Sequence, residues 1–98
     1  MQTDKLLGQN IIKEYRRYLR LERNFSVNTL EAYMLDVQKL LHYMQRAQLD
    51  VTQVELHHLQ DFSAMLHEIG VGPRSQCRIL SGVRSFFRFV QLNGYRDD

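Results

Sequence analysis

Proline, the residue that most strongly interrupts a helix, occurs once in this chain of 98 residues, at position 73. Only five glycines accompany it, and β-branched and aromatic residues form no alternating runs of the kind that mark strands. Apolar residues recur instead at steps of three and four, the period of a helix with one buried face. The sequence therefore predicts an all-α fold, and its length fits a single domain over residues 1–98 with one small core.

Four helices are predicted, and residues with known capping or stopping roles stand at their boundaries. Ser26 is a good N-cap for the second helix, and Thr52 with Glu55 has the capping-box spacing that would open the third. Gly70 is expected to stop the third helix, and Pro73 suits the first position of the fourth. Connections of a few residues make a small four-helix bundle the compact solution. The predicted helices span about residues 9–23, 27–46, 52–69 and 73–92.

Composition excludes several classes of protein. With 44% apolar and 24% charged residues, the chain is typical of a folded globular domain rather than a disordered one. The lone Cys77 rules out an internal disulfide and multi-cysteine zinc sites, and we expect an inert thiol in a reducing compartment. No apolar run approaches the roughly 20 residues that span a bilayer, and the first ten residues lack the apolar stretch of a signal peptide. We therefore expect a cytoplasmic protein with no membrane partner.

The sequence shows no pattern typical of catalysis or metal binding. His57, His58 and His67 lack a metal-binding spacing on one helical face, and there is no glycine-rich phosphate loop. Tyr95 lies beyond the last predicted helix, with no activating groups nearby in sequence. We expect no enzymatic activity, no cofactor and no metal in this chain. The other tyrosines fall on or beside apolar stripes and are predicted core or boundary residues: Tyr15, Tyr18, Tyr33 and Tyr43.

Charge varies strongly along the chain. Residues 1–24 carry six Lys or Arg and three acids, residues 25–68 carry two and six, and residues 69–98 carry five and two. A net charge of +2 does not by itself indicate a nucleic-acid partner. The interpretation depends on whether basic residues from separate stretches share a surface.

The fourth predicted helix is basic on one face and apolar on the other. It contains four arginines and no acid, although like charges four residues apart repel by about 0.2–0.5 kcal/mol per pair. Arginine bonds phosphates and guanine edges through two nitrogens at once, and short serine side chains permit close approach. The same arginines fit equally well with an ordinary solvated surface, where their aliphatic stems cover the core.

Two sequence motifs resemble a known family. Ser26-Val27-Asn28-Thr29, with Tyr33 and Asp36-Val37, is similar to the S-x-x-T-x-x-x-Y-x-x-D-Φ stretch (Φ apolar) near the start of tyrosine recombinases, the phage-integrase and Xer-type enzymes. Residues 70–90, GVGPRSQCRILSGVRSFFRFV, are similar to that family's G-x-s-x-x-S-x-x-R-x-L-S-x-x-R-x-F-Φ-x-F-Φ. The motifs stand in the family's order, about 45 residues apart, and the resemblance covers roughly residues 11–93.

The resemblance implies a non-catalytic domain, the N-terminal core-binding domain with its SAM-like four-helix fold. Such a domain lies across one side of duplex DNA while a separate catalytic domain closes over the other side. The chain ends where the family's linker would begin, so the arginine, histidine and nucleophilic tyrosine of the catalytic domain would be absent. The implied partners are double-stranded DNA, the catalytic domain of the same parent protein, and neighbouring subunits on the DNA.

In this family the second and fourth helices face the DNA, which predicts a DNA-binding face in this chain. Residues at the two helix starts are expected nearest the groove, and Arg78 is expected to touch a base edge. Alanine at both Arg74 and Arg78 is expected to weaken DNA binding with little change in thermal unfolding. The competing interpretation is a helical protein-interaction module that docks an acidic partner. The predicted DNA-binding residues are Asn28, Thr29, Lys39, Arg74, Ser75, Arg78, Ser81, Arg84 and Arg88.

Overall fold

The computed structural model describes residues 2–96 of the chain, with side chains from residue 10 onward. Its helices are α1 (Gln2–Leu21), α2 (Val27–Arg46), α3 (Leu56–Glu68) and α4 (Pro73–Leu92), and residues 2–96 contain no strand. The predicted all-α class with four helices is confirmed.

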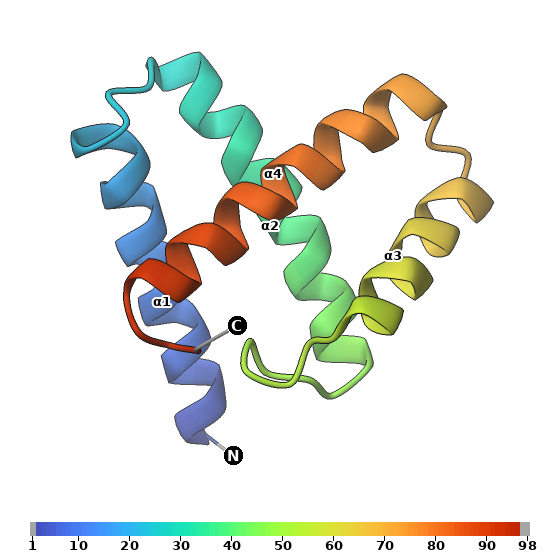
Figure 1. The fold of residues 1–98 in the computed structure, drawn as a ribbon, viewed down its shortest axis with the longest axis horizontal. Helices are drawn as coiled ribbons and strands as arrows, with labels where there is room; N and C mark the ends of the chain where they lie inside the picture. The colour runs from blue at the N-terminus through green and yellow to red at the C-terminus, as the bar shows by residue number, and fades with distance from the viewer. Residues whose placement is uncertain (1, 97–98) are drawn as a thin grey trace.

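The centre of the molecule is the crossing of α2 and α4 (Figure 1). In that view α4 passes in front of α2, α1 packs against both helices on the left, and α3 packs against α4 on the right. The first halves of α2 and α4 diverge upward from the crossing as a V, so both helix starts lie at the same edge of the molecule. The fold therefore brings together the middles of two helices that are more than 40 residues apart in sequence, while their starts lie at the two upper ends of the V.

The core lies between the four helices and includes a fully buried tyrosine. The ring of Tyr15 meets Phe86 edge-on, with centroids 5.2 Å apart, and its hydroxyl donates to Ser85 Oγ at 3.1 Å. Burial raises the pKa of Tyr15 to about 12, so the phenol stays neutral at pH 7. The four tyrosines predicted at core or boundary positions are all buried or half-buried. The most completely buried side chains include Tyr15, Leu19, Val37, Leu40, Phe62, Leu66, Phe86 and Val90.

Three of the predicted helix boundaries are confirmed. Ser26 is the N-cap of α2, and its Oγ accepts a hydrogen bond from the backbone N–H of Thr29 at 3.3 Å. Gly70 follows the C-cap of α3 with φ of +93°, a left-handed conformation that glycine adopts without strain. Pro73 occupies the first turn of α4, where its missing N–H costs nothing.

The predicted starts of two helices were wrong. The third helix begins at Leu56 rather than Thr52, because Asp50 Oδ1 accepts from the backbone N–H of Thr52 at 2.7 Å and holds this segment in a turn. The capping box forms three residues later, between Glu55 and His58: Nδ1 of His58 accepts from the N–H of Glu55 at 2.9 Å. The first helix begins at Gln2 rather than residue 9, and Gly8 lies within it without ending it.

Gly82 permits the close approach of α4 to α2. A Cβ placed on Gly82 would lie 3.0 Å from both Cβ and Oδ2 of Asp36. Glycine inside a helix costs about 1 kcal/mol relative to alanine, so a packing reason accounts for it here. The missing side chain lets Asp36 lie directly against the backbone of α4.

Gly82→Val is expected to lower the free energy of unfolding by about 2 kcal/mol, because the added side chain overpacks the crossing. Urea unfolding followed by circular dichroism measures the change. Ala64→Val, on the exposed side of α3, is the matched control and should stay within about 0.5 kcal/mol of the wild type. Equal losses in the two variants would show that the crossing is loosely packed.

Candidate nucleic-acid interface

An ion pair joins the two crossing helices. Nη1 of Arg78 on α4 lies 3.2 Å from each carboxylate oxygen of Asp36 on α2. Asp36 is only 2% exposed, whereas 55% of the Arg78 side chain is exposed. The guanidinium therefore covers a buried carboxylate and keeps an open side toward solvent.

The charge of Asp36 is balanced by two cations. Burial raises the pKa of Asp36 above its usual value, and the positive charges of Arg78 and Lys39 act in the opposite direction. Oδ1 of Asp36 accepts no hydrogen bond from the described residues, so the ion pair with Arg78 is its main compensation.

Exposed polar residues surround this ion pair on both helices. Lys39 lies one turn after Asp36, and Arg74 and Ser81 lie one turn before and after Arg78. Residues three or four apart share one side of a helix, and the Asp36–Arg78 contact joins the two sides. Lys39, Arg74, Arg78 and Ser81 together form what we name the crossing face.

The starts of α2 and α4 hold three further predicted residues. Asn28 and Thr29 are exposed in the first turn of α2, and Ser75 is exposed in the first turn of α4. Both turns lie at the upper edge of the V in Figure 1. The hydroxyl of Thr29 accepts from Ser26 Oγ at 3.0 Å, so it takes part in the cap of α2. Free backbone N–H groups at two helix starts favour an anion at this edge.

Arg84 and Arg88 lie further along α4, after Ser81. They line a surface groove of about 980 Å³ between α3 and α4, together with Arg96 and the apolar side chains of Leu56 and Phe87. Arg84 follows Ser81 by three residues and Arg88 follows Arg84 by four, about one helical turn in each case. These two arginines therefore continue the exposed polar side of α4 from the crossing face toward the α3–α4 groove.

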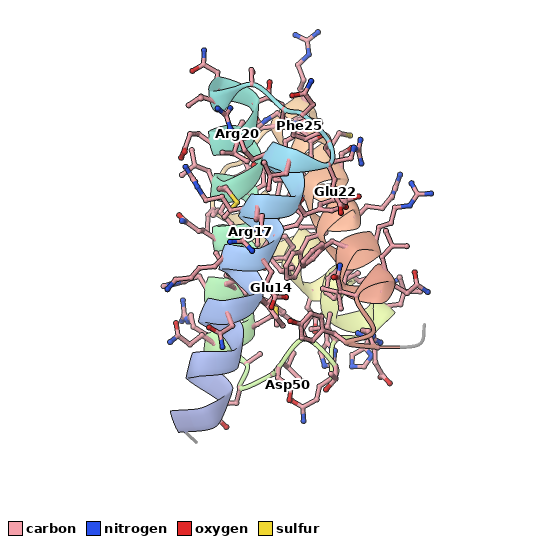
Figure 2. All side chains as sticks on the ribbon, turned by 90° about the vertical axis from the view of Figure 1, so that its left-hand side faces the viewer. Glu14, Arg17, Arg20, Glu22, Phe25 and Asp50 are labelled. Atoms are coloured by element: carbon pink, nitrogen blue, oxygen red, sulfur yellow. The ribbon has the colours of Figure 1, made fainter. Side chains whose placement is uncertain are left out.

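The basic residues of α1 form a separate stripe. Lys13, Arg17 and Arg20 line a second groove beside the start of α2. Arg16 belongs to the same groove and forms an ion pair with Glu31 at 2.6 Å. In Figure 2 the labelled arginines of α1 lie on the side of α2, and α4 lies on the opposite side of the view. The cations of α1 are thus apart from the crossing face.

Sequence reasoning missed the partner of Arg78. It considered that arginine as a DNA contact or as ordinary solvated surface, whereas the structure pairs it with the buried Asp36. The expectation that alanine at Arg74 and Arg78 would leave unfolding nearly unchanged is therefore withdrawn. Two signals in the sequence could have revealed the contact. Asp36 is next to Val37 of the apolar stripe of α2, and Gly82 lies in the interior of α4.

The described residues offer little besides this interface. Among them, no three His, Cys, Asp or Glu side chains are placed to hold a metal ion. None of their helices combines the length and apolar character needed to cross a membrane. Cys77 is exposed on α4.

The fold and both motifs define the class of domain. Residues 12–94 match the family model described as "Phage integrase, N-terminal SAM-like domain", and the chain belongs to this family. The predicted resemblance and the SAM-like fold are confirmed.

Among curated proteins, the chain is similar to tyrosine recombinases XerC. It is 41% identical over 81 residues to the protein of Pseudomonas syringae pv. syringae, which covers 82% of this chain and 27% of that protein. It is 37% identical over 81 residues to the protein of Leptospira interrogans serogroup Icterohaemorrhagiae serovar copenhageni, covering 80% of this chain and 25% of the relative. The chain thus spans about a quarter of the length of these curated relatives. No solved structure matches the chain significantly.

Proposed function

We propose that this chain binds duplex DNA as the core-binding domain of a tyrosine recombinase and does not itself cut the DNA. The observation that carries the proposal is the crossing face, where cations from α2 and α4 share one surface and the adjoining carboxylate of Asp36 is buried beneath Arg78. Membership of the phage-integrase N-terminal family supports it.

Most of the binding energy is assigned to phosphates. Lys39 and Arg74 neutralise backbone charges, and the first turns of α2 and α4, with Asn28, Thr29 and Ser75, supply polar contacts at the helix starts. The short side chain of Ser81 permits close approach of the DNA backbone to α4. Arg78 keeps an exposed guanidinium edge for a base, and the arginines over the α3–α4 groove, Arg84 and Arg88, contact phosphates further along the duplex.

In the whole protein, the domain acts together with parts that lie outside this chain. A catalytic domain of the same parent closes over the opposite side of the duplex and carries out strand transfer through a tyrosine nucleophile. Neighbouring subunits assemble on the same DNA, and the reaction takes place in the cytoplasm.

The direct test is a titration of a labelled duplex at two salt concentrations. We expect a Kd of about 10⁻⁴ to 10⁻⁶ M at physiological salt, and an affinity that falls steeply as salt rises, because each phosphate contact releases counterions. Fluorescence anisotropy measures both quantities. An affinity that does not depend on salt would contradict phosphate binding.

The competing function is docking of an acidic protein. Amide shifts in an NMR titration with a short duplex should be confined to α2 and α4 if DNA is the partner. Shifts only at the chain ends, or shifts at the α3–α4 groove with an acidic peptide and none with DNA, would favour the protein-interaction module. The apolar lining of that groove by Leu56 and Phe87 is the feature that suits such a peptide.

A further inference from the structure

We propose that Asp36 is a positioning residue that acts through Arg78, holding the arginine so that its remaining N–H groups point toward the duplex. This inference rests on the proposed function and extends it to a buried side chain that itself contacts no DNA. It concerns how the interface is prepared before binding.

The geometry of the ion pair leaves the correct edge of Arg78 open. Only Nη1 contacts Asp36, at 3.2 Å from each oxygen, and the described residues provide no acceptor for Nε or Nη2. Arginine carries five N–H donors in one rigid plane. The free Nε–Nη2 edge is the one that bonds two oxygens of a phosphate, or O6 and N7 of guanine, at once. More than half of the Arg78 side chain is exposed, which leaves room for a ligand beside it.

Asp36 is suited to this role because it has almost no freedom of its own. The side chain is in the middle of α2, is buried, and lies directly against the backbone of α4 at Gly82. A carboxylate held in one position also restricts the position of Arg78 Nη1, which donates a hydrogen bond to it. An unpaired arginine loses rotamer freedom when it binds, whereas Arg78 has lost part of that freedom during folding.

A purely structural ion pair makes a different demand on residue 78. A lysine would also place a positive charge over Asp36 and would satisfy the carboxylate, but it has no planar fork. Arg78→Lys therefore separates the two roles. If Asp36 positions a fork for DNA, Arg78→Lys keeps the fold and the net charge but loses affinity.

The experiment is a double-mutant cycle on DNA binding with the full chain. Asp36→Asn, Arg78→Lys and the combined variant are titrated against one 5′-labelled duplex at fixed low salt, and urea unfolding is measured on the same samples. We expect each single change to weaken binding roughly tenfold, within the range for a lost two-point contact. The combined variant should bind no more weakly than Arg78→Lys alone, because Asp36 acts only through the arginine.

Asp61→Asn is the matched control, because it removes one negative charge from an exposed site on α3. This variant should bind as tightly as the wild type or slightly more tightly. Side-chain ¹⁵N NMR adds a second readout: the Nε resonance of Arg78 should shift on addition of duplex in the wild type and much less in Asp36→Asn.

Three outcomes would overturn the positioning role. Equal weakening by Asp36→Asn in the wild-type and Arg78→Lys backgrounds would show a general structural effect. Tighter binding by Asp36→Asn, as in the control, would show that Asp36 acts only through its charge. If the wild type shows no salt-dependent binding at all, the proposed function fails as well, whereas salt-dependent binding without coupling overturns the positioning role alone.

Discussion

Arg74→Glu is expected to weaken DNA binding about 10- to 100-fold while leaving the chain as stable as the wild type or slightly more stable. Arg74 is the second residue of α4 and belongs to the crossing face. An acid in the first turn of a helix interacts favourably with the helix dipole, by about 0.3–1 kcal/mol. The same change removes a phosphate contact and adds repulsion from the duplex, so stability and affinity should move in opposite directions.

Fluorescence anisotropy and thermal unfolding on the same preparation measure both effects. Arg17→Glu is the matched control, since it makes the same charge change on the exposed stripe of α1, apart from the crossing face. This control should reduce affinity by only a few-fold, through the long-range field of the protein. A similar loss in both variants would mean that DNA binds through diffuse charge and that the crossing face has no special part in it.

Arg78→Ala is expected to lower the free energy of unfolding at pH 7 by about 2 kcal/mol. Removing one partner of a buried ion pair leaves an uncompensated charge and typically costs about 3–5 kcal/mol. The smaller figure applies because the guanidinium is half exposed, which makes the interaction weaker. Asp36→Asn combined with Arg78→Ala should recover most of the loss, because no buried charge remains.

The loss in Arg78→Ala should also depend on pH. Burial raises the pKa of Asp36 in the folded chain, and Arg78 is one of two cations, with Lys39, that lower it. Without Arg78 the folded-state pKa rises further above that of the unfolded chain. A raised carboxyl pKa means that stability falls as pH rises from the unfolded pKa through the folded one, and returns as the group is protonated.

The difference in unfolding free energy between Arg78→Ala and the wild type is therefore expected at pH 7 and should shrink toward about pH 4, near the ordinary pKa of an aspartate. Urea unfolding over this pH range measures it. The Asp36→Asn/Arg78→Ala variant serves as the control, and its stability relative to Asp36→Asn should vary little with pH. A pH-independent loss in Arg78→Ala would assign the effect to lost packing of the arginine stem.

Local signals in the sequence predicted most of the fold, because helix ends depend on neighbouring residues. Ser26, Gly70 and Pro73 each act within one turn of the boundary they mark. The start of α3 was missed because two capping patterns overlap there. Thr52 and Glu55 have the spacing of a capping box. In the structure the backbone N–H of Thr52 donates to Asp50 Oδ1, and Glu55 is the N-cap of α3.

The candidate site was harder to predict, because it depends on contacts between distant residues. The apolar periodicity of α4 correctly predicted that Arg74, Arg78 and Ser81 are exposed on one side of the helix. The partner of Arg78 is 42 residues away in sequence, on another helix. Periodicity describes each helix separately and contains no information about the angle at which two helices cross. The Asp36–Arg78 contact therefore could not be predicted from the sequence of either helix.

The direct contact between Gly82 and Asp36 bears on the kind of duplex that fits the domain. At Gly82 no side chain separates the backbone of α4 from Asp36, so a change in the angle of the V would disrupt this close-packed contact. The two helix starts then present their contacts at a constant spacing. A duplex whose groove is wider or narrower than this spacing must itself bend or twist, at an energetic cost that depends on its base composition. Local DNA stiffness, even at base pairs that no side chain touches, would then contribute to the choice of binding site.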